Sequence, residues 1–210
     1  MIKISHLGSL SILAMTAIFA YSGCASVDTD EEDPQADDIE EADLGEAQDE
    51  LVYSCSNVSN TKWPAGWKDL ETALIKEVNK KRAEGVTCKN GGWKKPVDAL
   101  TLNTKLRCAA RSHAKDLAVS GSPASHTGSD GTNEVDRAKQ AGYVPYQDYV
   151  NENASGGQTV VANLVTNYIN SSSTHCKTMM DPIVKNIGVG YYKTTGGTIR
   201  WVMDVGKPQP

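Results

Sequence analysis

The fold class of this chain is decided near its end, by Ile187-Gly188-Val189-Gly190-Tyr191-Tyr192 and by Thr198-Ile199-Arg200-Trp201-Val202-Met203-Asp204-Val205. Both runs are rich in β-branched and aromatic residues, which favour strands. Thr195-Gly196-Gly197 separates them, as in two antiparallel strands joined by a turn. Upstream, the sequence predicts helices and no repeated strand–helix–strand unit. These features indicate an α+β fold rather than a doubly wound parallel sheet.

Four helices are predicted before this pair of strands. Leu70, Leu74 and Val78 recur at a spacing of four residues, which is typical of a helix with one buried face. Gly85 is expected to end that helix. His113 lies near the apolar face of the second helix, where we expect it to be packed and hydrogen-bonded rather than a ligand. The helices are predicted at residues 69–84, 103–117, 134–141 and 159–168.

The first 23 residues are predicted to be a signal peptide. Lys3 precedes an apolar run over residues 7–20, shorter than the roughly 20 residues that a membrane-spanning helix needs. Ser22-Gly23-Cys24 then resembles a bacterial lipobox, in which the cysteine is acylated and becomes the new N-terminus. We therefore expect lipidation at Cys24, where two acyl chains would anchor the protein stably. The alternative is ordinary cleavage near Ala20, which leaves Cys24 unmodified.

Charge divides the rest of the chain into a linker and a domain. Residues 28–50 hold 13 of the 26 acidic residues and no Lys or Arg, so residues 24–52 are predicted to be the acylated cysteine and a disordered acidic linker. The folded domain is predicted over residues 53–207. It has 20 of the 21 basic residues, yet no basic stripe interleaved with aromatic residues, so no nucleic-acid partner is expected.

Four cysteines remain in the predicted domain, Cys55, Cys88, Cys108 and Cys176. An even number of cysteines in an exported chain predicts two disulfides, and three connectivities are open. No Cys-x-x-Cys pair indicates a structural zinc site.

Three further segments carry a family resemblance. They are Ser125-His126-Thr127-Gly128-Ser129-Asp130-Gly131, Glu152-Asn153-Ala154, and Ser171-Ser172-Ser173-Thr174-His175-Cys176, the last leading to Ile187-Gly188-Val189-Gly190. Their order resembles the CAP superfamily (cysteine-rich secretory proteins, antigen 5 and pathogenesis-related proteins; also called the SCP domain), in particular its secreted bacterial branch. The resemblance covers residues 70–206. It implies a three-layer α-β-α sandwich with a small antiparallel sheet and a cleft on one side.

The resemblance also implies a disulfide pairing. Bacterial relatives often have cysteines that match Cys88 and Cys176, so these two are expected to pair. Cys55 is then left to pair with Cys108.

The implied cleft contains the candidate site. In animal and plant relatives two histidines and two glutamates line it, and some of these proteins bind a divalent metal there. His126, Glu152 and His175 match three of the four positions, so they are the candidate catalytic and metal-binding residues. Tyr168 stands for the tryptophan that precedes the second glutamate, and Ser171 stands for that glutamate. Two imidazoles and one carboxylate can hold Zn²⁺ with an open position for water. The alternative is a polar groove whose side chains hydrogen-bond to each other and require no cofactor.

Two functions follow from the resemblance. The first is a non-enzymatic binding module of the cell envelope or the exterior, with a lipid, polymer or protein as its ligand. The second is a metal-assisted hydrolase, peptidase-like, that uses His126, Glu152 and His175. Arg137 is expected to form a structural ion pair beneath the loop after His126. The protein is expected to be a monomer and an exported, membrane-anchored lipoprotein, on the outer membrane if the cell has two, or else secreted.

Overall fold

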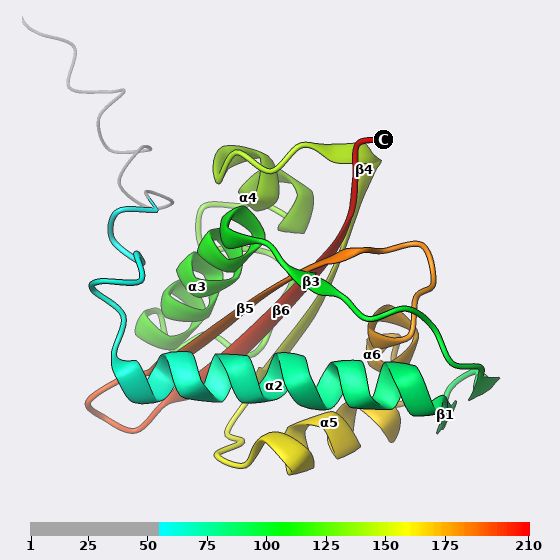
Figure 1. Ribbon diagram of the computed structural model, residues 1–210. Coiled ribbons are helices and arrows are strands. Elements are labelled where there is room, and N and C mark those ends of the chain that lie inside the picture. The colour runs from blue at the N-terminus through cyan, green and yellow to red at the C-terminus, as the bar shows by residue number, and fades with distance from the viewer. Residues whose placement is uncertain (1–54) are drawn as a thin grey trace, which may run out of the picture. The chain divides into compact units, whose positions relative to one another are not determined.

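The computed structural model describes residues 55–210, which form a sheet covered by helices on both faces (Figure 1). The predicted signal peptide, the lipidation site Cys24 and the acidic linker lie outside these residues. Within them, no helix is long and apolar enough to cross a membrane. The elements in chain order are α2 (Ala65–Glu84), β1 (Val86–Cys88), β2 (Gly92–Lys94), β3 (Thr101–Leu102), α3 (Thr104–Val119), α4 (Glu134–Gln140), β4 (Pro145–Gly156), α5 (Val161–Ile169), α6 (His175–Met179), β5 (Asn186–Lys193) and β6 (Ile199–Pro208).

Helices α3 and α4 begin at side-chain caps. The side chain of Asn103 accepts hydrogen bonds from the backbone N–H groups of Lys105 and Leu106, so it caps α3. Asn133 caps α4 through a reciprocal pair of bonds with Asp136. Helix α2 begins at Ala65, four residues before the predicted start, directly after Pro64. A proline at this position fits because the first N–H groups of a helix have no partner within it.

The main sheet has the strand order β3-β5-β6-β4. Strands β5 and β6 form the predicted antiparallel hairpin, with Tyr191 opposite Trp201. Strand β4 pairs antiparallel with β6 and was not predicted. The expectation of a purely antiparallel sheet needs one correction, because the two-residue strand β3 pairs parallel to β5. The backbone N–H groups of Thr101 and Asn103 donate to the carbonyls of Lys185 and Ile187, which holds this short strand at the sheet edge.

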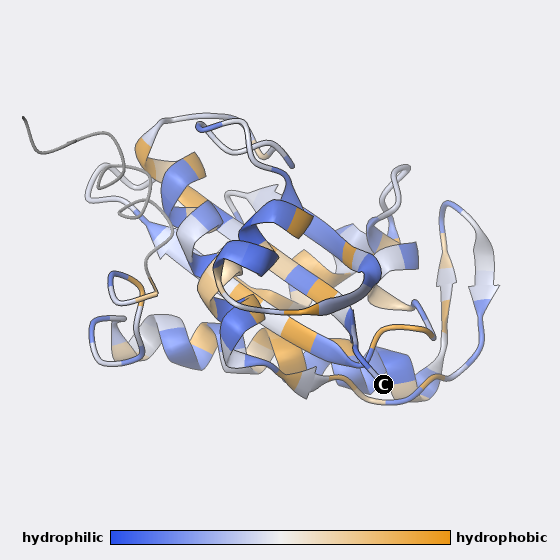
Figure 2. Cartoon of the chain, turned by 90° about the horizontal axis from the view of Figure 1, so that it is seen from above, coloured by the Kyte–Doolittle hydropathy of each residue, from blue (hydrophilic) through white to orange (hydrophobic). Residues whose placement is uncertain are grey.

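One face of the sheet carries the largest apolar core. Ile187, Val189 and Tyr191 of β5 and Trp201 and Met203 of β6 alternate along their strands and pack in one cluster with α2 and α5. Apolar residues gather in the sheet and on the inward sides of the helices (Figure 2). Of the α5 residues, Leu164, Val165 and Tyr168 are buried.

The opposite face of the sheet lies unusually close to α3. Gly188 and Gly190 alternate with the apolar residues of β5, and a Cβ atom at either position would collide with the α3 backbone, at Leu106 or at Ala110. Ala110, Ala114 and Leu117 of α3 complete this layer with Val202. The result is the expected α-β-α sandwich, with α2, α5 and α6 on one face of the sheet and α3 and α4 on the other (Figure 1).

Two disulfides connect the periphery to these layers. Cys55 is bonded to Cys108 of α3, and Cys88 of β1 is bonded to Cys176 of α6. The second is the pair that the family resemblance implies, and the first is the pair left over by elimination. The first fixes the segment before α2 on α3. The second fixes the β1–β2 hairpin on the helix that begins with His175.

Candidate functional site

Glu152 is the centre of the candidate site. It lies on β4, which pairs with β6, and its side chain is fully buried between the sheet and α4. One carboxylate oxygen, Oε1, lies 2.9 Å from Nδ1 of His126, and the other, Oε2, accepts a bond of 2.6 Å from Arg137. Burial opposes ionisation, but the bond from His126 and the charge of Arg137 outweigh it and lower the pKa of Glu152. Both oxygens of the ionised Glu152 carboxylate therefore already have hydrogen-bond partners.

Arg137 provides the charge that compensates Glu152. It lies on α4 and is fully buried, and its guanidinium also donates to the carbonyl oxygens of Thr132 and His126 at 2.7 and 3.1 Å. One side chain thus binds both ends of the loop that presents His126. The prediction of a structural ion pair beneath this loop is confirmed.

His126 is the exposed member of the site. Its side chain is 55% exposed, and only its Nδ1 atom is bonded to Glu152. The hydrogen bond to Glu152 raises the pKa of His126 against the opposing effect of partial burial. Within residues 55–210, Nε2 has no hydrogen-bond partner, so this nitrogen remains available to a ligand. A carboxylate that orients one imidazole nitrogen so that the other faces outward is a common arrangement at protein sites.

His175 lies on the same side of the molecule and is half-buried. It begins α6, and its carbonyl oxygen accepts a bond of 3.0 Å from Asn153, the neighbour of Glu152 on β4. Its ring packs edge-on against Tyr168, with the centroids 5.5 Å apart. Burial lowers the pKa of His175, and the positive charge of His126 lowers it further, so the two imidazoles lie within electrostatic reach of each other.

Ser171, which the family resemblance matches to the second glutamate, has no carboxylate. Its hydroxyl bonds to that of Ser173 at 2.7 Å within its own loop. Tyr168, matched to the tryptophan, is fully buried. The acids Glu134 and Asp130 lie near His126 in the sequence, but among the described residues they have no contact with His126, Glu152 or His175 at hydrogen-bond distance.

Two further buried groups lie beneath the site. His113 Nε2–H donates to the carbonyl of Ser125 at 2.8 Å, and the same nitrogen lies 3.7 Å from Glu152 Oε1. It is packed and hydrogen-bonded, as predicted, and burial lowers its pKa. Asp204 lies opposite Glu152 on β6, and within residues 55–210 neither of its oxygens has a hydrogen-bond partner. Burial, followed by the negative charge of Glu152, raises the pKa of Asp204 well above its usual value. Asp204 was not predicted as a site residue, although an acid in the apolar run 201–205 was the available signal.

These residues do not fit a divalent metal as they are arranged. Within residues 55–210, no group of three or more His, Cys, Asp or Glu side chains is placed to hold an ion. Nδ1 of His126 and Oε1 of Glu152 are bonded to each other, and Oε2 of Glu152 is bonded to Arg137. A metal at Glu152 would have to displace the buried guanidinium of Arg137. The arrangement therefore does not support a metal-dependent step at this carboxylate.

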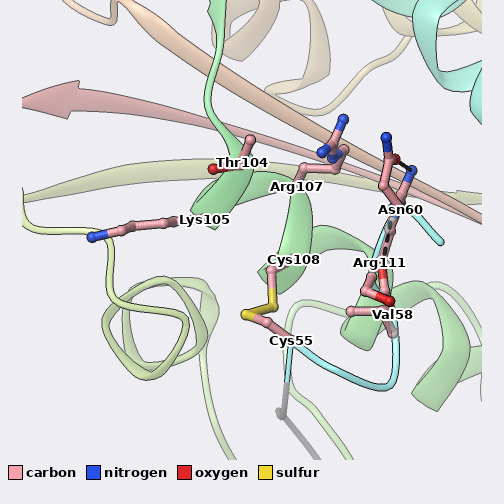
Figure 3. Close-up of a pocket in the computed structure, with 9 residues that line it drawn as sticks. Cys55, Val58, Asn60, Thr104, Lys105, Arg107, Cys108 and Arg111 are labelled. Carbon is pink, nitrogen blue, oxygen red and sulfur yellow. Dashed lines mark hydrogen bonds between the residues drawn. A yellow bond between two sulfur atoms is a disulfide. The ribbon is translucent and has the colours of Figure 1, made fainter. Parts of the chain in front are cut away.

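Two cavities within the described residues lie away from this site. One, of about 250 Å³, lies between the segment after Cys55 and α3, beside the Cys55–Cys108 disulfide (Figure 3). Arg111 lines it but is bonded to Glu71 at 2.6 Å and to the carbonyl of Val58. The other, of about 310 Å³, is lined by residues of α3 and by Asn57, Val58 and Ser129. Neither cavity is lined by His126, Glu152 or His175.

Three solved structures are similar to this chain, and the first of them supports the fold. An outer surface protein of Borrelia burgdorferi has a structure that matches 68% of this chain and 95% of its own length, at 20% identity and a TM-score of 0.55. Venom allergen-like protein 4 of Schistosoma mansoni matches 70% of this chain and 92% of its own length, at 15% identity and a TM-score of 0.41. BmVAL-1 matches 70% and 78%, at 16% identity and a TM-score of 0.38. Among curated protein sequences, none matches this chain.

The family assignment comes from the sequence itself. A family model for the cysteine-rich secretory protein family, CAP, matches residues 75–205. This range includes all of the site residues described above and more than half of the chain. The chain belongs to the cysteine-rich secretory protein (CAP) family.

Proposed function

We propose that this protein is an exported binding module, and that it recognises a component of the cell envelope or the exterior through His126 and His175. The ligand is a lipid, a polymer or a protein that offers hydrogen-bond acceptors to the two imidazoles. The predicted lipid anchor at Cys24 would hold the module at the membrane, and the acidic linker would separate it from the bilayer. Two disulfides support export, since such bonds persist in oxidising compartments.

The hydrogen bonds of Glu152 are the main support for this proposal. Its two oxygens are bonded to His126 and Arg137, so the carboxylate orients an imidazole and offers no free base. The imidazole that it orients is exposed, with a raised pKa and an unused Nε2. A partly protonated, fixed donor at the surface suits recognition of an anionic or carbonyl oxygen.

The hydrolase alternative finds less support in this arrangement. A general base needs a free lone pair within reach of the proton that it removes. Glu152 is fully buried beneath His126, and Ser171 adds no carboxylate. We therefore favour binding over turnover at this site.

The histidine ring protons provide a direct test. The chain from residue 25 onward has only three histidines, His113, His126 and His175. We would follow their Cε1–H signals by NMR while adding soluble peptidoglycan fragments and, separately, short-chain phosphatidylglycerol. The proposal predicts that one probe shifts the His126 and His175 signals and leaves the buried His113 signal in place.

Two variants sharpen this test. His126→Gln and His175→Gln should each weaken binding of the probe that shifts the histidine signals by about tenfold, because each variant removes one charge-assisted hydrogen bond. Lys76→Gln, on the exposed side of α2, is the matched surface control and should bind normally. If neither probe shifts the His126 and His175 signals at millimolar concentration, the proposal is wrong.

A further inference from the structure

The β1–β2 hairpin has an unusual combination of exposed residues. It projects from one end of the domain, at the right-hand edge of Figures 1 and 2. Residues 85–96 contain three lysines and no acidic residue. Trp93 on β2 is 61% exposed, whereas Trp63 and Trp201 are buried in the domain. A large amphipathic ring exposed among lysines is suited to a partner that is apolar at one depth and anionic at another.

The hairpin is held rigidly in this position. The disulfide from Cys88 ties it to α6, and the backbone N–H of Lys89 donates to the carbonyl of Ile169 at 3.0 Å. The amide of Asn90 donates to the carbonyls of Ser172 and Ser173 at 2.9 and 3.2 Å. The Trp93 ring lies against Gly85, where a Cβ atom would come within 2.8 Å of two ring carbons. The surface is therefore formed before any partner arrives, which lowers the entropic cost of docking.

A fourth lysine joins the hairpin from α6. A Cβ atom at Gly91 would lie 2.8 Å from Cε of Lys177 and 3.6 Å from Nζ of Lys94, so these two side chains flank the turn. In the part of the chain that the structure describes, none of the four lysines forms an ion pair. We call this set the Trp93–lysine surface, and it consists of Trp93, Lys89, Lys94, Lys95 and Lys177.

We propose that the Trp93–lysine surface docks on an anionic lipid bilayer. The indole ring would enter the headgroup region, where tryptophan is favoured because one side of it is apolar and its N–H is polar. The lysines would lie at the depth of the lipid phosphates and add about fivefold each to the binding constant. This interaction uses no residue of the His126 site.

The chemistry of the hairpin favours a bilayer over an anionic sugar polymer. Sugar recognition needs amide or carboxylate groups beside the aromatic ring, to bond the hydroxyls. The amide of Asn90 is already used by Ser172 and Ser173, and residues 85–96 contain no carboxylate. What remains is an indole ring and four positive charges, which suit a surface of lipid phosphates.

The predicted lipid anchor would make even weak docking effective. Thirty residues separate Cys24 from Cys55. A linker of this length would hold the domain at a high effective concentration near the bilayer, so a modest affinity of the hairpin would fix its orientation. The docking itself is tested without the anchor, using the chain from residue 25 onward.

The test is sedimentation with vesicles of phosphatidylcholine alone or mixed with phosphatidylglycerol. We expect binding to the anionic vesicles only, with quenching of tryptophan fluorescence by brominated lipids. Trp93→Ser should abolish the quenching, because Trp93 is the exposed tryptophan. The triple variant Lys89→Gln/Lys94→Gln/Lys95→Gln should weaken binding at least tenfold.

The control variant removes three lysines from other exposed positions, Lys62→Gln/Lys76→Gln/Lys193→Gln. It has the same net charge as the hairpin variant and should bind anionic vesicles like the wild-type chain. Equal weakening by both triple variants would show a non-specific charge effect and overturn the proposal. So would wild-type binding to soluble anionic polysaccharide without binding to vesicles. Either result would leave the histidine NMR test untouched.

Discussion

Glu152 and Asp204 lie opposite each other on neighbouring antiparallel strands, yet their carboxyl groups have contrasting surroundings. Glu152 accepts a bond of 2.6 Å from Arg137 and is bonded to His126, and its pKa is lowered. Asp204 is fully buried, with no hydrogen-bond partner within residues 55–210, and its pKa is raised well above the usual value. One positive charge, on Arg137, thus compensates one of two adjacent acids, and burial beside that ionised acid favours the neutral form of the other.

The raised pKa of Asp204 should be visible in the stability of the protein. A carboxyl group whose pKa is raised on folding makes the folded state bind more protons than the unfolded one. Stability is therefore lost as the pH rises above about 4, the unfolded value, toward the folded value. Asp204→Asn removes this loss, so at pH 7 the variant should be more stable than the wild type by at least about 1 kcal/mol.

Urea denaturation of both proteins between pH 4 and pH 8 measures this effect. The difference in the free energy of unfolding between variant and wild type should shrink toward pH 4, where Asp204 of the unfolded chain is also protonated. A variant that is less stable than the wild type at every pH would show that the Asp204 carboxylate is ionised and paired. Glu152, Arg137 and Glu134 act electrostatically on Asp204, so the measured difference includes the change in their own interactions when Asp204 is replaced.

Loss of Arg137 should destabilise the folded protein far more than loss of an exposed cation on the same helix. Arg137→Met leaves the buried Glu152 without its charge partner and should cost about 3–5 kcal/mol. Lys139→Met is the matched control, since it removes an exposed ion pair with Asp148 and should cost less than about 1 kcal/mol. Chemical denaturation of the two variants compares these costs. Similar costs would contradict a structural role for the Arg137–Glu152 pair.

The two site histidines should titrate in a fixed order. The bond to Glu152 raises the pKa of His126, whereas burial lowers that of His175. An NMR titration of the native chain should therefore show His126 titrating at a higher pH than His175. In Glu152→Gln the pKa of His126 should fall, because the carboxylate that stabilises the imidazolium is gone. The reverse order in the native chain would mean that His126 is not bonded to Glu152.

Close packing between β5 and α3 gives a further prediction. Gly188→Ala places a methyl group against the backbone of Leu106 and Arg107, which cannot move aside, so the variant should lose about 3 kcal/mol or fail to fold. Gly196→Ala, in the β5–β6 turn, has space for the methyl group and should change stability by less than about 1 kcal/mol. Thermal unfolding monitored by circular dichroism distinguishes the two. Tolerance of alanine at 188 would contradict the close approach of the sheet to α3.

Most of the fold was predictable because its elements follow simple patterns. The apolar spacing of α2, the Asn103 cap of α3 and the Gly-Gly turn between β5 and β6 are local signals, and each element forms where they indicate. Strand β4 was missed because its pattern is not that of an ordinary strand. Its central residues Glu152 and Asn153 are polar and buried, and Gln147 and Asp148 have positive φ.

The candidate site was only partly predictable for the same physical reason. The convergence of His126 and Glu152 follows from the family resemblance, and the ion pair of Arg137 from its place after the His126 loop. The pairing of both Glu152 oxygens and the buried Asp204 depend on strand register between β4 and β6. Register is set by contacts across the whole sheet, which no local pattern of residues reveals.

We propose, as the central claim, that the two oxygens of Glu152 are held by hydrogen bonds to Arg137 and His126 and that the site recognises a ligand without a metal. Isothermal titration of the chain from residue 25 onward with ZnCl₂, beside the His126→Ala/His175→Ala variant, tests it most directly. We predict no difference between the two proteins at micromolar Zn²⁺. Stoichiometric binding in the wild type that is lost in the double variant would contradict the claim and restore the metal-assisted hydrolase.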